Sequence, residues 1–329
     1  MNSYSLFTWR HPALSLLMIV SVGTAASYGH PFLLDNSIMI GIFSLMALSV
    51  GISYGQAGIL SLATATFAAI GAFATAILTV NYRLSPYLGL LAAILLPTVC
   101  AYLLARCILR LSPLPLSIAT FVLGGLVEVL IKQGGDFTGG YIGLSGIPRL
   151  SIAPSAQAMH FLTWAVVLLV VVLCVSLMNS STGRAINTAR HDPLRAVADG
   201  VDVPHLLSNT FAFSGAIAGV AGWLYAHHIT YIGPDSLTTQ VSITVLLMAV
   251  VGGVKVILGP IFGAAILMVV VLYLPAAESQ GMFFGSILVF MLLVAPNGLL
   301  GSRWRLPTLR GGLERPTSPM LLMPAKEEN

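Results

Sequence analysis

The chain has 329 residues, of which 57% are hydrophobic and only 8% are charged, and its mean hydropathy is +0.93. Soluble domains have about 45–50% apolar and about 25% charged residues, so this composition excludes an ordinary water-soluble fold. The net charge of +4 does not indicate nucleic-acid binding, because the basic residues form short clusters between apolar runs instead of one continuous face.

Long apolar runs without two-residue alternation occur along the whole chain. Lipid offers no hydrogen bonds to the backbone, so such runs cross a membrane as helices. The segments that we predict to span the membrane are 12–28, 37–54, 60–80, 87–105, 114–131, 161–178, 206–228, 241–254, 258–274 and 281–295. The predicted fold is an all-α integral membrane protein with about ten transmembrane helices. Residues 1–28 also fit a secretory signal, but its removal would leave an odd number of spans, so we retain the first span.

The distribution of Lys and Arg predicts the orientation of these spans. With the N-terminus in the cytoplasm, only Arg83, Lys132 and Arg149 lie outside, and the other twelve of the 15 basic residues lie inside. This asymmetry follows the positive-inside rule and predicts that both termini are cytoplasmic.

The loops between the spans define the domain organisation. We expect residues 1–301 to form one transmembrane domain and residues 302–329 to form a disordered cytoplasmic tail. Within the domain, residues 132–159 are rich in Gly and Pro and predict a turn-rich external cap. The cytoplasmic loop 179–205 is where we expect a functional element.

That loop contains the start and stop signals of a short helix over residues 193–199. Asp192 suits the N-cap, Pro193 suits the first helical position, and Gly200 suits the residue just past the end. So short a helix is unstable alone in water and needs a docking partner. Its apolar residues share one face and are Leu194, Val197 and Ala198. The partner is either another protein or anionic lipid, which Arg184, Arg190 and Arg195 would favour.

Polar residues inside the apolar runs are candidates for a solute pathway, namely Gln56, Ser61, Thr64 and Glu128. Gln56 lies between two glycines, where the helix either unwinds to expose polar backbone or packs tightly against a neighbour. Glu128 either faces the pathway or pairs with Lys132, four residues later on the same helix face. For His227 and His228 an aromatic interface belt explains the sequence better than metal binding.

Gly-Gly spacings of four residues predict close helix packing at Gly51 and Gly55, at Gly215 and Gly219, and at Gly259 and Gly263. The sequence has no Gly-x4-Gly-Lys-[Ser/Thr] phosphate loop, so energy for transport must come from another subunit or from an ion gradient. We therefore expect a transporter subunit and not an enzyme.

Several ordered motifs resemble the permease subunits of branched-chain amino-acid ABC transporters, the LivM-type family, over residues 35–301. They are Gly55-Gln56-Ala57-Gly58-Ile59-Leu60-Ser61-Leu62, Phe67-Ala68-Ala69-Ile70-Gly71-Ala72, Gly183-Arg184-Ala185-Ile186 with Gly200-Val201, Phe213-Ser214-Gly215-Ala216-Ile217-Ala218-Gly219-Val220-Ala221-Gly222, Tyr231-Ile232-Gly233-Pro234-Asp235-Ser236, and Gly252-Gly253 with Gly259-Pro260. The resemblance implies a multi-pass protein of the bacterial inner membrane that imports branched-chain or related small amino acids. A stand-alone secondary transporter or channel for urea or an amide is the alternative.

The resemblance also implies partners: a second permease that is expected to form a heterodimer with this chain, two cytoplasmic ATPase subunits that bind the ATP, and an external solute-binding protein. It implies that the loop holds the coupling helix that docks on the ATPase. The residues assigned to this coupling are Arg184, Arg190, Asp192, Pro193, Leu194, Arg195, Val197, Ala198 and Gly200. The loop departs from the family, which often has a glutamate and an alanine pair where this chain has Val197 beside Arg195 and Asp199.

Overall fold

The computed structural model describes residues 31–108, 113–273, 286, 289 and 298–300. The predicted span 12–28, nearly all of the span 281–295 and the tail 302–329 lie outside the described residues.

The described chain is built almost entirely of helices. The α-helices are α2 Pro31–Val50, α3 Thr64–Ala76, α4 Pro86–Ile108, α5 Pro113–Gln133, α6 Ala156–Asn179, α7 Ser181–His191, α8 Pro193–Ala198, α9 Val203–Ile229, α10 Thr239–Gly252 and α11 Gly259–Tyr273. The other elements are the π-helical turns η1 Gly51–Gln56 and η2 Ile77–Asn81, the 3-10 turn η3 Gly135–Phe137, and the strands β1 Leu144–Ser145 and β2 Tyr231–Ile232.

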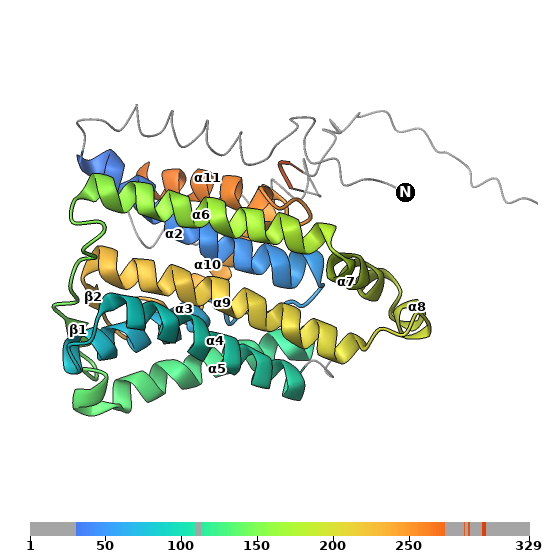
Figure 1. The fold of residues 1–329 in the computed structure, drawn as a ribbon, viewed down its shortest axis with the longest axis horizontal. Helices are drawn as coiled ribbons and strands as arrows, with labels where there is room; N and C mark the ends of the chain where they lie inside the picture. Colours follow the sequence, from blue (N-terminus) through green and yellow to red (C-terminus); the bar gives the residue numbers. More distant parts are fainter. Residues whose placement is uncertain (1–30, 109–112, 274–285, 287–288, 290–297, 301–329) are drawn as a thin grey trace, which may run out of the picture.

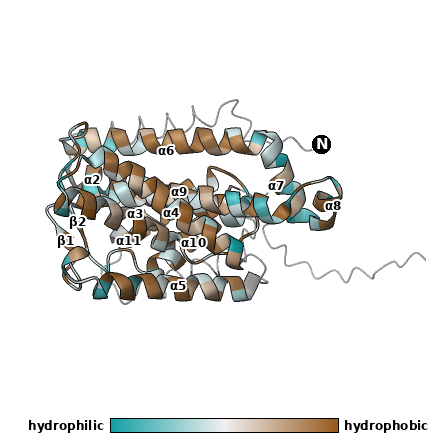
Figure 2. Ribbon diagram, turned by 60° about the horizontal axis from the view of Figure 1, so that its bottom comes forward, coloured by the Kyte–Doolittle hydropathy of each residue, from teal (hydrophilic) through white to brown (hydrophobic). Residues whose placement is uncertain are grey.

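The long helices lie side by side, with the two short strands at one end and α7 and α8 at the other (Figure 1). Among the described residues, five helical segments are long and apolar enough to cross a membrane, and they are Pro31–Gln56, Thr64–Asn81, Pro86–Cys107, Pro115–Gln133 and Ala156–Asn179. Hydrophobic residues dominate these helices, whereas hydrophilic residues gather on α7 and around the strands (Figure 2). The prediction of a helical membrane protein is confirmed, and the count of ten spans stays a prediction.

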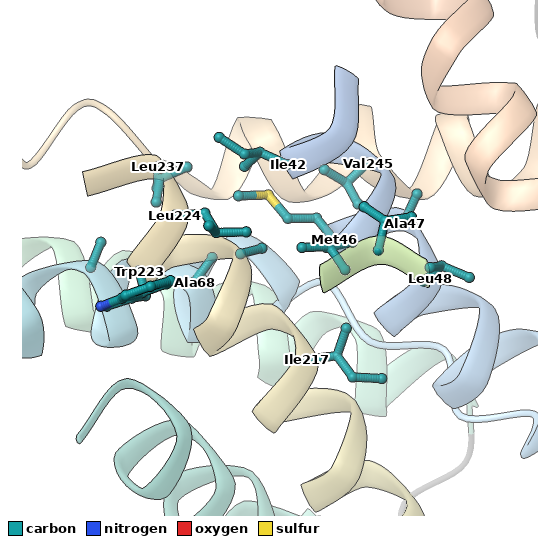
Figure 3. Close-up of a cluster of buried hydrophobic side chains, with 14 of the residues drawn as sticks. Ile42, Met46, Ala47, Leu48, Ala68, Ile217, Trp223, Leu224, Leu237 and Val245 are labelled. Atoms are coloured by element: carbon teal, nitrogen blue, oxygen red, sulfur yellow. The ribbon is translucent and has the colours of Figure 1, made fainter. Parts of the chain in front are cut away.

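Helix α9 occupies the centre of the bundle and contacts α2, α3 and α4. Small residues bring the backbones together: a Cβ built on Gly71 of α3 would lie 2.6 Å from the carbonyl oxygen of Gly219 of α9. Helices α2, α3, α9 and α10 also share an apolar core, which includes Met46, Ala68 and Leu224 (Figure 3). Small residues let helix backbones approach closely, and the resulting van der Waals packing contributes to association between helices in lipid.

The glycine pairs predicted from the sequence all lie in such contacts. A Cβ on Gly51 would meet Pro260 at 2.9 Å, and one on Gly215 would meet Ala101 at 2.7 Å. Cβ atoms on the four other glycines would collide with backbone carbonyl oxygens, and these glycines are Gly55, Gly219, Gly259 and Gly263. The tight-packing interpretation of these glycines is therefore confirmed.

Hydrogen bonds near the ends of the helices show which loops lie at the same end of the bundle. At the strand end, Asn81 Nδ2 donates to the Phe137 carbonyl at 3.0 Å, and β1 pairs with β2 in antiparallel register. At the opposite end, Arg106 Nη2 lies 3.1 Å from His205 Nδ1. Successive loops therefore alternate between the two ends, as expected for a chain that crosses a membrane repeatedly.

The loop between α5 and α6 is rich in glycine and in turns, as the sequence predicts. Its glycines Gly139, Gly140, Gly143 and Gly146 all have positive φ, which L side chains rarely adopt. The β1–β2 pair, which ties this loop to the chain after α9, has only two residues in each strand and was not predicted.

Candidate functional site

The short helix predicted in the 179–205 loop is present as α8. Asp192 Oδ1 accepts a hydrogen bond from the Arg195 amide at 3.0 Å, and Pro193 is the first helical residue. Gly200 has φ of 80° and its amide donates to the Val197 carbonyl at 3.0 Å, which closes the C-terminal end. The predicted caps are confirmed, although the helix ends at Ala198, one residue earlier than expected.

The apolar stripe of α8 faces away from the described protein. Leu194 is 84% exposed and Val197 is 60% exposed, and Ala198 is also exposed. On the opposite side Ala196 is completely buried and holds the helix against the rest of the chain. Exposed Leu and Val on so short a helix form a surface that a partner can cover.

A second helix of this loop, α7, was missed in the sequence. Ser180 Oγ caps it by accepting from the Gly183 amide at 3.4 Å, and Ile186 and Ala189 are buried on its inner face. The sequence does contain a signal for this helix, because Ser180 suits the N-cap and the apolar residues Ile186 and Ala189 are three positions apart. Helix α7 anchors α8 to the ends of the spanning helices.

The two arginines of α7 that were assigned to coupling lie in different surroundings. Arg184 is exposed and its Nη1 donates to the Asn179 carbonyl at 3.4 Å. Arg190 is half-buried, and its Cγ lies 3.5 Å from a Cβ built on Gly58. Arg195 on α8 is exposed. Arg190 therefore packs against Gly58, in the segment that follows η1.

That segment, residues 57–63, is not helical and separates η1 from α3. Gly58 has φ of 76°, and the Ile59 amide donates to the Ser53 carbonyl at 2.8 Å. Ile59 and Ala63 are buried. Irregular backbone inside a membrane protein is tolerated where protein covers it or where it lines a polar cavity. The structure thus shows the interruption of the helix that Gly55 and Gly58 suggested.

Hydroxyl groups from other helices satisfy the amides at this interruption. Thr120 Oγ1 of α5 accepts from the Leu62 amide at 2.9 Å, and Ser242 Oγ of α10 accepts from the Ala65 amide at 2.9 Å. Ser61 Oγ accepts from the nearby Ala63 amide at 3.2 Å, and Thr64 is buried as the first residue of α3. Ser61 and Thr64 therefore lie in one polar seam between α3, α5 and α10.

The other two predicted pathway residues have defined partners. Gln56 Nε2 donates to the Lys255 carbonyl at 3.2 Å, at the α7 end of the bundle. Glu128 Oε1 lies 2.8 Å from Lys132 Nζ, which also lies 3.1 Å from Asp235 Oδ1. The pairing of Glu128 with Lys132, one of the two alternatives from the sequence, is confirmed.

The histidines at the end of α9 take part in polar contacts. His227 Nε2 lies 3.2 Å from Thr75 Oγ1, and its Nδ1 lies 2.8 Å from the Pro148 carbonyl oxygen. His228 Nε2 lies 2.9 Å from Asp35 Oδ1. Within the described ranges, no group of three or more His, Cys, Asp or Glu residues is arranged to hold a metal ion. His227 therefore links the loop between α5 and α6 to α3.

Residues Gly51 to Gly55 match the Gly-x-Ser-x-Gly pattern of hydrolase nucleophiles. In those enzymes the serine lies on a sharp turn between a strand and a helix. Here Ser53 is buried within η1, and its Oγ donates to the Ser49 carbonyl at 3.1 Å. Ser53 is a packing residue and has no nucleophile geometry.

Comparison with known proteins agrees with this arrangement. The family described as branched-chain amino acid transport system / permease component matches residues 32–295. The high-affinity branched-chain amino acid transport system permease protein LivM of Escherichia coli is 29% identical over 295 residues, which cover 81% of this chain and 69% of the relative. No solved structure matches the chain.

More distant relatives carry other names. The probable branched-chain amino acid transport permease protein LivH of Methanocaldococcus jannaschii is 24% identical, with 84% of this chain and 94% of the relative covered. The fructose import permease protein FrcC of Rhizobium meliloti is 24% identical, with 71% and 67% covered. The match to the family extends over most of the chain, and the chain therefore belongs to the branched-chain amino acid transport system permease family, as a multi-pass subunit of the plasma membrane and not an enzyme.

Proposed function

We propose that this permease imports branched-chain amino acids, or related small amino acids, with energy from ATP hydrolysed by two separate cytoplasmic subunits. The observation that carries the proposal is the exposed apolar stripe of α8, where Leu194 and Val197 face outward from a helix fixed by Ala196. A groove of an ATPase that covers this stripe removes apolar surface from water. Movement of the ATPase is then transmitted through α8 to the permease.

A protein partner fits α8 better than a lipid surface does. Helix α8 lies beyond the ends of α6 and α9, at the far tip of the bundle (Figure 1). Asp192, Asp199 and Asp202 balance the charges of Arg184, Arg190 and Arg195, so the net attraction of this loop to anionic headgroups is weak. Helices that lie on lipid are instead rich in Lys and Arg on their polar face.

The proposal places the α7–α8 end in the cytoplasm. Five described basic residues lie at this end, and they are Arg106, Arg184, Arg190, Arg195 and Lys255. Three lie at the strand end, and they are Arg83, Lys132 and Arg149. The positive-inside rule then supports a cytoplasmic α7–α8 end, and with ten spans both termini would lie on that same side. A cysteine at Thr182 should be labelled by a membrane-impermeant maleimide only in inverted vesicles, and one at Ile142 only in intact cells.

A second permease and an external solute-binding protein complete the proposed importer. The seam between α3, α5 and α10, which contains Ser61 and Thr64, lies on the side of α5 opposite its exposed apolar face. That exposed face includes Phe121, Val122 and Leu126, which suit either lipid or the second permease. We propose a heterodimeric permease pair with the solute passing along its polar seams.

Reconstitution tests the proposal. The chain is assembled with its candidate partner permease, ATPases and binding protein in vesicles, and uptake of labelled L-leucine is measured. ATP-dependent uptake that survives a protonophore supports the importer. Uptake by this chain alone, without ATP and abolished by the protonophore, would refute it.

A further inference from the structure

Three polar side chains meet where α4 ends and α9 begins, at the α7–α8 end of the bundle. Arg106 Nη2 of α4 lies 3.1 Å from His205 Nδ1 of α9, and Arg106 Nε donates to the Tyr102 hydroxyl oxygen at 3.2 Å. The guanidinium carbon also lies 5.5 Å from the centre of the Tyr102 ring, which is within the range of a cation–π contact. These contacts hold a long and flexible side chain in one orientation.

No acidic side chain neutralises Arg106 in the part of the chain that the structure describes. The ion pairs there join Lys132 to Glu128 and Asp235, and His228 to Asp35. The acid closest to His205 in the sequence is Asp202, and its Oδ1 accepts from the His205 amide at 3.1 Å as the N-cap of α9. The positive charge of Arg106 is therefore available to an anion from outside the protein.

The cluster also has hydrogen-bond donors to spare. A guanidinium has five N–H groups, and the two contacts of Arg106 use one on Nε and one on Nη2, which leaves both on Nη1. Because Arg106 can only donate, His205 Nδ1 accepts, and the proton of the neutral His205 ring is on Nε2. The Tyr102 hydroxyl accepts from Arg106 and keeps its own hydrogen. Every group left over is a donor, which suits an anionic oxygen ligand.

An exposed apolar ridge on α4 leads to this cluster. Its side chains follow one another at four-residue spacing and are 52–59% exposed, and they are Leu91, Leu95, Val99 and Leu103. In a membrane such a ridge packs against lipid chains, which are as apolar as leucine. Arg106 lies about one turn beyond Leu103 and one residue before the end of the apolar segment Pro86–Cys107. Its guanidinium is thus at the level where the lipid headgroups begin.

We propose that Tyr102, Arg106 and His205 bind the phosphate of an anionic phospholipid whose acyl chains lie along the α4 ridge. Arginine binds phosphate oxygens through paired N–H groups, and basic sites between membrane helices bind acidic lipid headgroups. The ridge favours a lipid over a free phosphate ion, because only a lipid has acyl chains to cover it. The site goes beyond the proposed function and does not depend on which solute is imported.

Thermal unfolding of the full chain in nanodiscs tests the site. The discs contain phosphatidylcholine alone or phosphatidylcholine with phosphatidylglycerol, and both leaflets have the same composition. Phosphatidylglycerol should raise the thermal midpoint of the wild type, and Arg106→Gln should remove most of this rise. The matched control is Arg83→Gln, which removes an exposed arginine just before the other end of α4 and should keep the rise. Equal rises for Arg106→Gln and the wild type would overturn the inference.

Substitutions of His205 separate anion binding from the packing of the cluster. His205→Asp keeps Arg106 but places a carboxylate beside it, so the response to phosphatidylglycerol should be lost although every arginine is present. His205→Asn keeps a neutral acceptor for Arg106 and should retain the response. A response of His205→Asp equal to that of His205→Asn would contradict the site.

Native mass spectrometry distinguishes a lipid from a free anion. The detergent-purified wild type should retain added phosphatidylglycerol in preference to phosphatidylcholine, and Arg106→Gln should lower the retained amount about tenfold, as expected for a lost hydrogen bond to a charged group. Inorganic phosphate at the same concentration should leave the bound lipid in place. Displacement of the lipid by inorganic phosphate would identify a free-anion site and overturn the lipid proposal.

Discussion

Gln56 and Lys255 are joined by a hydrogen bond of 3.2 Å from Gln56 Nε2 to the Lys255 carbonyl oxygen. The bond ties the last residue of η1 to the turn between α10 and α11. Gly55 reinforces it, because its Cα lies against the Val254 carbonyl with no room for a Cβ. The end of the helix is therefore held in place by these two contacts, directly before the irregular segment 57–63.

Gln56→Glu should destabilise the contact between η1 and the turn that contains Lys255. A carboxylate cannot donate to the Lys255 carbonyl and faces its partial negative charge, so we expect a loss of about 1–3 kcal/mol in the free energy of unfolding. Thermal unfolding of the protein in detergent measures it, with Gln133→Glu at the exposed end of α5 as the control. An unchanged midpoint together with lost uptake would place Gln56 in the solute pathway instead.

Leu194→Asp should uncouple the permease from the ATPases without unfolding it. Leu194 is 84% exposed, so a charge there costs the isolated permease little but is buried against a docking groove. We expect the ATPases to be lost on purification of the complex and uptake to fall at least tenfold, while Leu194→Met retains both. Retained ATPase binding by Leu194→Asp would argue against docking through α8.

Gly71→Ala should loosen the contact between α3 and α9. The new Cβ would lie 2.6 Å from the Gly219 carbonyl oxygen and 2.8 Å from the Gly219 Cα. Overpacking of this kind costs about 1–3 kcal/mol, because neither backbone can shift independently. The thermal midpoint should fall, whereas Gly125→Ala, which meets no neighbour, should leave it unchanged or higher. Equal midpoints for the two variants would contradict the packing described for α9.

Glu128→Gln should have a small effect on both stability and transport. The partly exposed pair with Lys132 contributes about 0–1 kcal/mol, and Lys132 keeps Asp235 as a second partner. We expect a midpoint shift of a few degrees at most and uptake within about twofold of wild type. Loss of uptake at unchanged stability would assign the Glu128 carboxylate to the pathway, the other alternative that the sequence allowed.

The sequence by itself determined the features that depend on neighbouring residues. Apolar runs predicted the spanning helices, and the local caps Asp192, Pro193 and Gly200 predicted α8 to within one residue. These signals act over three or four positions, so no knowledge of the fold is needed to find them. Small residues at four-residue spacing likewise predicted close contacts, although not which helices make them.

Only the tertiary structure decided which distant residues meet. Nothing local shows that Gln56 bonds to Lys255, or that Thr66 and Thr239 converge on Gly124, because each contact depends on how three helices are rotated about their axes. That rotation is set by backbone packing across the whole bundle, as at Gly71 and Gly219. Hydrophobic patterning cannot specify it, since lipid-facing and buried surfaces of these helices are equally apolar.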